Sequence, residues 1–271
     1  MVIRLFLEKE IKNIVIIGSG NVSYHLINAF NRIGVNVLQI LARNENTAKY
    51  LSGTFKIPYI LQASKLNKEA DLYILSVKDD NIRSSAMGLG LDNQILVHTS
   101  GFAPIDILEG ASAFTGVIWP LQTLTSGIEA DYSHMPFFIE GKTNEVTEKL
   151  THFVRQVSDK VLVTDSPTRQ KIHLAAVIAS NLTNHLYAIS ASILDKYDIP
   201  FDVLAPLIIE TANKAGRQHP MSSQTGPAVR NDLHVIAKHL EMLRDDPAAR
   251  EIYRMITENI IHHHSKKNEK L

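Results

Sequence analysis

The chain has 271 residues, of which 45% are hydrophobic and 21% charged, and its 28 Lys and Arg balance its 28 Asp and Glu. This composition is ordinary for a globular protein, and the balanced charge argues against nucleic acid as a partner, because phosphate binding needs an excess of cations. Cysteine is absent, which excludes disulfides, thiolate catalysis and Cys-based zinc sites.

Two segments bear on where the protein works. The N-terminal residues 1–10 lack the long apolar region and the small-residue cleavage site of a secretory signal. The longest apolar helical segment, residues 171–194, is interrupted by two histidines and two asparagines, which a membrane span would not readily carry. We therefore expect a cytoplasmic protein with no membrane partner.

From residue 12 to about residue 165, short apolar runs alternate with amphipathic stretches, as in βαβ units. The expected strands are residues 14–17, 37–41, 59–61, 72–77, 95–99, 116–118, 137–140 and 161–164. The expected helices between them are residues 22–33, 46–54 and 143–157. An uninterrupted apolar run such as 14–17 is typical of a parallel strand that is buried on both faces.

After Asp165 the alternation stops and only helical patterns follow. Ser166 and Pro167 form a helix-start signal, with Ser as the N-cap and Pro at the first position. The expected helices are residues 167–197, 201–216, 227–244 and 247–263. The sequence thus predicts an α/β fold: a doubly wound, mostly parallel Rossmann sheet over residues 1–165, followed by an all-α domain over residues 166–271.

A glycine-rich turn, Gly18-Ser19-Gly20-Asn21-Val22-Ser23, joins the first expected strand to the first expected helix. Gly18 suits the tight turn, Gly20 lets the backbone approach a pyrophosphate, and the helix N-terminus supplies amide donors. The last position is Ser23 in place of Gly or Ala, and it is still small enough for close helix–strand packing. The strand before and the helix after the turn indicate a dinucleotide site. The alternative is a βα turn that binds nothing.

The end of the second expected strand bears on which nucleotide binds. NAD-specific sites place Asp or Glu there to hold the ribose 2′-hydroxyl, whereas this strand ends in Ala42-Arg43-Asn44. A cation at that point pairs with a 2′-phosphate, so the sequence favours NADP(H) over NAD(H) as cofactor. Two alternatives stay open, because Glu45 could take the ribose role and Arg43 could be a solvated loop residue.

Later strand ends should lie on the same edge of the sheet, where ligands bind in such folds. We expect Ser76, Val77, Lys78 and Thr99 to contact the cofactor. Ser100 is expected at the catalytic centre and Gln122 at the substrate. The alternative for each position, taken singly, is ordinary turn chemistry.

Several stretches resemble the DUF2520 family of Rossmann-like oxidoreductases. They are residues 70–80, His98-Thr99-Ser100-Gly101, Pro120-Leu121-Gln122-Thr123, Ala179-Ser180-Asn181 and residues 225–232. The resemblance runs in order over nearly the whole chain. It implies an NADP-binding Rossmann domain and a helical domain similar to that of 6-phosphogluconate dehydrogenase-like proteins. The first half more distantly resembles pyrroline-carboxylate reductases and F420-dependent NADP oxidoreductases.

The chain departs from the family pattern at two places. Relatives usually have His-Pro-Leu-Gln where this chain has Trp119 before Pro120, so a role for an imidazole there has no support. The run Arg230-Asn231-Asp232 keeps the Arg and the Asp but lacks the glycine between them. The resemblance therefore supplies a class of protein and no particular reaction.

The first long helix after residue 165 should carry a polar stripe. The residues that fall on one face by helical spacing are His173, Val177, Ser180, Asn181, Asn184 and Tyr187. Burying such a face costs free energy unless it meets partners or a ligand. We expect His173 to act as general acid or base at the catalytic centre and Asn181 to orient the substrate there, and we expect Ser180 and Asn184 to bind the substrate. The alternative is a face turned to solvent or to a partner subunit.

Arg230 is a further candidate for substrate binding. If a helix starts at Pro227, Arg230 lies one turn in and can hold a substrate carboxylate. The alternative is an ion pair with Asp232 or Glu241. The histidines at 262–264 lack accompanying Cys or carboxylate ligands, so we expect no metal site.

These features together predict an NADP(H)-dependent oxidoreductase that moves a hydride to or from a small carbonyl, imine or hydroxy-acid substrate. The long apolar helices of the second domain have few neighbours of their own, which favours a homodimer through that domain. Two rival hypotheses stay open. One is a non-catalytic NADP-binding sensor or assembly protein, and the other is a purely structural βα protein without nucleotide affinity.

Overall fold

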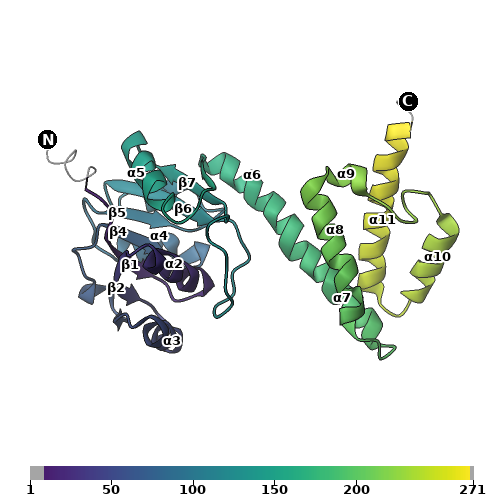
Figure 1. Cartoon of the computed structure of the whole chain (residues 1–271), viewed down its shortest axis with the longest axis horizontal. Helices are drawn as coiled ribbons and strands as arrows, with labels where there is room; N and C mark the ends of the chain where they lie inside the picture. Colours follow the sequence, from purple (N-terminus) through teal and green to yellow (C-terminus); the bar gives the residue numbers. More distant parts are fainter. Residues whose placement is uncertain (1–8, 269–271) are drawn as a thin grey trace. The chain divides into compact units, whose positions relative to one another are not determined.

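A computed structural model describes residues 9–268 of the chain. The chain forms two compact units, Met1–Asn181 and Leu182–Leu271 (Figure 1). Most of the N-terminal segment considered for a secretory signal lies outside the described residues. None of the described helices is both long and apolar enough to cross a membrane. The cytoplasmic location stays a prediction.

The first unit is built on one sheet with the strand order β3-β2-β1-β4-β5-β6-β7-β8 among the described residues. The strands are β1 (Asn13–Ile17), β2 (Asn36–Leu41), β3 (Tyr59–Ile60), β4 (Leu72–Leu75), β5 (Ile95–His98), β6 (Phe114–Pro120), β7 (Phe137–Gly141) and β8 (Val161–Val163). All neighbours pair in parallel except β6 and β7. The winding reverses between β1 and β4, so the doubly wound Rossmann sheet is confirmed.

Both faces of the sheet are covered. On β1, Ile14 and Ile16 face one apolar cluster and Val15 and Ile17 face another, as expected of an uninterrupted apolar run. Each such side chain contributes about 1.5–3 kcal/mol on full burial. The first cluster packs under α2 (Asn21–Arg32), α3 (Glu45–Phe55) and α5 (Asn144–Val154), and the second under α4 (Ile82–Met87) and the 3-10 helix η3 (Ile105–Leu108). Two further 3-10 helices are η1 (Ala63–Lys65) and η2 (Asp79–Asn81).

The antiparallel pairing of β6 with β7 places an irregular segment at one edge of the sheet. Residues 121–136, which we call the β6–β7 loop, leave β6 after Pro120 and return to β7 at Phe137, the residue paired with Pro120. The loop contains no helix or strand. Both of its ends therefore lie at the carboxyl edge of the parallel strands, where ligands bind in this class of sheet.

The first unit ends in the helix α6 (Ser166–Val177), which runs into one π-helical turn, Ile178–Leu182. The N-cap is Asp165, whose side chain accepts from the Thr168 amide at 2.8 Å, so the predicted cap at Ser166 is wrong by one residue. The hydroxyl of Ser166 is instead bound to Glu140. The boundary predicted at Asp165 falls where the sheet gives way to helix, while the compact unit continues to Asn181.

The second unit is helical. Its elements are α7 (Thr183–Asp195), the 3-10 helix η5 (Phe201–Leu204), α8 (Ala205–Arg217), α9 (Pro220–Ser223), α10 (Leu233–Met242) and α11 (Pro247–Asn268). The expected helix start at Pro227 is wrong, because residues 227–231 form turns and Asn231 has a φ of 53°. Asp232 caps α10 by accepting from the Val235 amide. Asn tolerates left-handed backbone and Asp is a strong N-cap, so the helix starts after this pair.

This unit has little interior of its own. Among residues 182–265, for which burial is described, only Ala228, Ile236, Ala249 and Thr257 are buried. Large apolar side chains stay exposed, for example Leu207 at 64% and Ile209 at 60% on α8. A helical unit of this size cannot gain much stability from so few buried side chains.

Candidate functional site

The glycine turn brings three strand ends together. The amide of Gly18 donates to the carbonyl oxygen of Leu41 at 2.8 Å, and the amide of Ser76 donates to Ile17 at 2.7 Å. Gly18 has a φ of +118°, and a Cβ there would lie 2.2 Å from the carbonyl oxygen of Ser76. Only glycine fits a left-handed position in contact with another backbone.

The second glycine faces open space. Gly20 is the N-cap of α2, and nothing lies within 4 Å of the place a Cβ would take. The first amides of α2 therefore open onto a cradle that suits an anionic group. Behind the turn, the buried Ser23 hydroxyl is 3.3 Å from the Cβ position of Gly18, so this side chain provides the close helix–strand packing expected of the third small residue.

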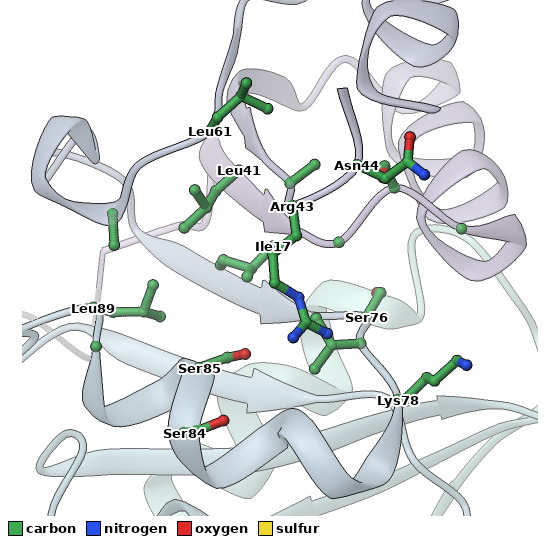
Figure 2. A pocket seen from close by; sticks show the side chains of 17 residues that line it. Ile17, Leu41, Arg43, Asn44, Leu61, Ser76, Lys78, Ser84, Ser85 and Leu89 are labelled. Atoms are coloured by element: carbon green, nitrogen blue, oxygen red, sulfur yellow. The ribbon is translucent and has the colours of Figure 1, made fainter. Parts of the chain in front are cut away.

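A pocket of about 410 Å³ opens beside this cradle, between the ends of β1, β2 and β4 and the helix α4 (Figure 2). The Arg43 side chain extends into the middle of it, between Ser76 and Ser85 (Figure 2). Its Nη1 donates to Asn81 Oδ1 at 3.3 Å. The predicted cofactor residues that line the pocket are Gly18, Ser19, Gly20, Arg43, Asn44, Ser76, Val77 and Lys78.

Three predicted cofactor residues do not line this pocket. Val22 packs against the apolar cluster under α2. Thr99 donates from its amide and hydroxyl to the carbonyl oxygen of Leu75, which joins β5 to β4. The side chain of Asn21 binds Ser126 in the β6–β7 loop. Sequence reasoning also missed the α4 side of the pocket, which includes Ser84, Ser85, Gly88 and Leu89.

Glu45, the alternative ribose ligand, is engaged elsewhere. Its carboxylate pairs with Lys49 Nζ at 2.9 Å and accepts from the Tyr59 hydroxyl at 3.4 Å. The hydrogen bond from Lys49 lowers the pKa of Glu45. Glu45 is not among the residues that line the pocket, so the cation Arg43 dominates the charge at this end of it.

A second pocket of about 360 Å³ lies between the end of β6, the β6–β7 loop, α6 and the π turn. It brings together four predicted residues that are far apart in sequence: Gln122, His173, Ser180 and Asn181. The remaining lining residues are Trp119, Pro120, Leu121, Thr123, Ala176, Val177 and Ala179. The pocket thus combines an apolar wall with neutral hydrogen-bonding groups and one imidazole.

The predicted polar stripe divides at the π turn. His173, Val177, Ser180 and Asn181 line the second pocket, whereas Asn184 lies beyond the turn, is exposed and does not line it. A π turn bonds i to i+5, so it interrupts the α-helical spacing that would place later residues on the same face. Nothing in the local sequence indicates this turn.

His173 is held against the aromatic wall of the pocket. Its ring meets Trp119 edge to face, with 5.7 Å between the ring centroids. A Cβ on Gly101 would lie 2.7 Å from His173 Nδ1 and 2.7 Å from Trp119 Cε2, so this glycine allows the β5 loop to pack against both rings. No hydrogen bond from the described part of the chain occupies either ring nitrogen, and Nδ1 faces Gly101.

A buried cation that sequence reasoning missed locks this arrangement. Arg169 of α6 is fully buried and pairs with Glu140 of β7 at 2.9 Å. Its Nη1 donates to the carbonyl oxygens of Ser100 and Ala103, both at 2.8 Å. Because charges are buried only with partners, this network fixes α6, and with it His173, against the loop after β5.

The loop after β5 is itself internally bonded. The hydroxyl of Ser100 lies 2.8 Å from Asp79 Oδ2, to which it donates, and accepts from the Phe102 and Ala103 amides. Ser100 does not line either pocket, and its hydroxyl holds the turn together. The neighbouring His98 is buried, and this burial, followed by the charge of Arg169, lowers the pKa of His98 to about 3.

Arg230 lies in the second unit, exposed, in the turn before α10. It lines neither pocket. Of its two suggested ion-pair partners, Asp232 caps α10 and Glu241 pairs with Arg244 at 3.1 Å. Among the described residues, no group of three or more His, Cys, Asp or Glu could hold a metal ion.

The fold and the glycine cradle define a dinucleotide-binding protein of the Rossmann class. Residues 135–260 match the family described as domain of unknown function DUF2520, and residues 13–100 match the family of coenzyme F420-dependent NADP oxidoreductases. A Bacteroides fragilis protein described as a "putative NADP oxidoreductase" is 38% identical, over 93% of this chain and 98% of that one, with a TM-score of 0.88. The chain belongs to the DUF2520 family, so the predicted resemblance is confirmed.

More distant solved structures share the fold. Pyrroline-5-carboxylate reductase from Streptococcus pyogenes is 15% identical over 94% of this chain and 98% of that one, with a TM-score of 0.60. A reductive aminase from Aspergillus terreus, in complex with NADPH and ethyl-5-oxohexanoate, is 11% identical over 94% of this chain and 95% of that one, with a TM-score of 0.69. No curated protein matches the chain.

Proposed function

We propose that the protein is an NADP(H)-dependent oxidoreductase that reduces a small carbonyl or imine, or oxidises a hydroxy acid. The observation that carries the proposal is Arg43, a cation at the end of β2 that extends into the pocket beside the glycine cradle (Figure 2). Glu45, which could have favoured NAD(H), is paired with Lys49 instead. The 38% identity to a described NADP oxidoreductase supports the same class.

Each pocket has a separate task in this proposal. When bound, NADP(H) supplies or accepts the hydride. The amides at Gly20 and the start of α2 bind the pyrophosphate, and Arg43 binds the 2′-phosphate. In the second pocket, Gln122 and Asn181 hydrogen-bond the polar group of the substrate, and the imidazole of His173 gives or takes the proton that balances the hydride.

The nucleotide assignment is tested by calorimetric titration with NADPH and NADH. Replacing Arg43→Ala should weaken NADPH binding about 10- to 100-fold, because it removes a charge-assisted contact, and should leave NADH binding unchanged. Arg83→Ala is the matched control, since Arg83 is exposed on α4 and does not line the pocket. Equal losses for both nucleotides, or none, would contradict the assignment.

Turnover separates the enzyme from a non-catalytic NADP-binding sensor. A panel of ketones, imines and hydroxy acids is screened by following nicotinamide absorbance. For any substrate found, His173→Asn should lower kcat by about 10²–10⁴, as removal of a general acid or base does, with NADPH affinity kept. A protein that binds NADPH tightly but turns over none of the panel would favour the sensor.

We also propose that the protein is a homodimer through its helical unit. The support is the small number of buried residues in that unit and the exposure of Leu207 and Ile209 on α8. A second copy of the chain would cover such side chains and supply the missing interior.

A further inference from the structure

One face of α2 is polar and turned toward the β6–β7 loop. Asn21, His25, Asn28 and Arg32 follow one another at spacings of four, three and four residues, which places them on one side of the helix. Each of the four contacts the loop or its aromatic anchor Tyr132. The helix that forms the nucleotide cradle therefore also holds the loop that borders the second pocket.

His25 is the centre of these contacts. Its ring is 2% exposed and Tyr132 is 4% exposed. Nε2 lies 2.9 Å from the carbonyl oxygen of Thr125, and Nδ1 lies 2.8 Å from the Tyr132 hydroxyl. A carbonyl only accepts, so Nε2 carries the proton, and in a neutral ring Nδ1 accepts from Tyr132. Asn28 Nδ2 donates to the same hydroxyl at 3.2 Å, so the groups satisfy one another.

Asn21 connects the β6–β7 loop to the glycine turn that forms the nucleotide cradle. It is the first residue of α2, directly after Gly20. Its Oδ1 accepts from the amide of Ser126 at 3.1 Å and from the Ser126 hydroxyl at 2.8 Å. An anion bound at the first amides of α2 would order the backbone of Asn21, and with it the side chain that holds Ser126.

The beginning of the same loop forms part of the second pocket. Gln122 and Thr123 line it, and Gln122 Oε1 accepts from the Thr123 amide at 2.9 Å. The loop has no helix or strand of its own. Besides backbone bonds such as the one from the Leu121 amide to the Pro136 carbonyl oxygen, its path between Pro120 and Phe137 depends on side-chain contacts. Among these, the contacts with His25 and Asn21 tie the part of the loop that follows Gln122 to α2.

We propose that His25 is a positioning residue: through Thr125 and Tyr132 it fixes Gln122 and Thr123 in the second pocket. Through the adjacent contact of Asn21 with Ser126, nucleotide bound at the glycine turn strengthens this arrangement. By linkage, an ordered loop then strengthens nucleotide binding to the same degree. This inference rests on the proposed function, because it requires a dinucleotide at Gly18–Gly20.

The test uses the whole protein, NADP⁺ as probe and two readouts that need no substrate. One is hydrogen exchange of residues 121–132 with and without NADP⁺. The other is acrylamide quenching of Trp119, which is the single tryptophan of the chain and lies in the second pocket. In the wild type, NADP⁺ should slow exchange in the loop and reduce quenching. Binding itself is measured separately by calorimetry.

The variant is Tyr132→Phe, which removes only the hydroxyl bound to His25 and Asn28. Its affinity for NADP⁺ should fall only by the part that the ordered loop contributes to nucleotide binding. In the presence of NADP⁺, the protection of the loop amides from hydrogen exchange should fall about tenfold. Tyr73→Phe is the matched control: Tyr73 is fully buried, and its hydroxyl donates to Asn67 at 2.8 Å away from the loop. It should lose stability but keep the nucleotide response.

The outcomes separate this inference from the proposed function. If the wild type does not bind NADP⁺, the proposed function fails, and the inference with it. If NADP⁺ binds but leaves the wild-type loop unchanged, only the inference is overturned. The inference is overturned in the same way if Tyr132→Phe keeps the full nucleotide response, or if Tyr73→Phe loses it equally. His25→Gln, which retains an amide for Thr125, should lie between Tyr132→Phe and the wild type.

Discussion

Two glycines of one turn should respond in opposite ways to the same substitution. In Gly18→Ala the new Cβ would lie 2.2 Å from the carbonyl oxygen and 2.8 Å from the carbonyl carbon of Ser76, at a φ of +118°. The left-handed backbone costs about 1–3 kcal/mol and the overpacking a further ~1–3 kcal/mol. The expected loss of about 2–6 kcal/mol is a large part of the roughly 5–15 kcal/mol typical of a folded domain.

Gly20→Ala should leave the fold almost unchanged. Gly20 has a φ of −90°, and no atom lies within 4 Å of its Cβ position. Ala is a poorer N-cap than Gly by roughly 0.5–1 kcal/mol, and this is offset by about 0.4–1 kcal/mol from the smaller freedom of the unfolded chain. The new methyl group would instead project into the cradle and weaken NADP⁺ binding by about tenfold or more, because it blocks the close approach of the pyrophosphate.

Urea unfolding, followed by the fluorescence of Trp119, measures the first effect, and calorimetric titration with NADP⁺ measures the second. A Gly18→Ala protein as stable as the wild type would refute the steric argument. A Gly20→Ala protein that binds NADP⁺ as well as the wild type would show that no phosphate lies against this turn.

Three further predictions concern charge, pH and assembly. Arg169→Met should lower the free energy of unfolding by about 3–5 kcal/mol, measured in urea, because it leaves Glu140 without its buried partner. His98 stays neutral in the folded chain, with a pKa of about 3, while the unfolded chain takes up a proton below the ordinary value of 6.5. The contribution of neutral His98 to the free energy of unfolding is therefore fully present above pH 6.5. It is lost as the pH falls toward 3, and the loss reaches roughly 2 kcal/mol at pH 5. Leu207→Asp on the exposed face of α8 should reduce the mass measured by light scattering toward that of one chain.

Each of these has a matched control. For Arg169, the double variant Arg169→Met, Glu140→Gln should recover part of the loss, since no unpaired charge remains and an amide oxygen still accepts from Ser166. No recovery would show that the loss does not come from an unpaired charge. For His98, the variant His98→Asn should flatten the acid limb of the stability curve, and an unchanged limb would assign it to other groups. For Leu207, the control is Asn213→Asp, which adds the same charge about 120° around α8 from Leu207. A wild-type protein that is already monomeric would refute the homodimer.

The sheet could be predicted because its sequence signal is local. Strands such as β1, β4 and β5 are buried on both faces, so they form uninterrupted apolar runs with polar turns between them. The glycine turn was equally clear, since Gly18 and Gly20 lie between a strand and a helix. The side of the first pocket formed by the strand ends then followed from topology, because parallel strands bring Arg43 and Ser76 to one edge of the sheet.

The missed features depend on contacts between distant segments. Arg169 looks like any surface cation of a helix until Glu140 and the loop after β5 are placed around it. The π turn at Ile178–Leu182 has no local signal, and Asn184, which follows it, does not line the second pocket. The prediction of a helix start at Pro227 was wrong for a local reason. Asn231 in left-handed backbone and Asp232 as N-cap form a stronger helix-start signal a few residues later. The partners of His25 lie about a hundred residues later in the chain, so the sequence of α2 does not indicate what its polar face contacts.

The reversed direction of β7 has a consequence for where the chain can vary. Had β7 run parallel to β6, the chain would have crossed behind the sheet and re-entered at the opposite edge, usually through a helix. Reversal lets it turn back at the rim, so that residues 121–136 lie outside the pattern of strands and crossover helices. The length and composition of the β6–β7 loop can therefore change without disturbing any crossover connection between parallel strands. Divergence among relatives within such a stretch can alter which molecules enter the second pocket.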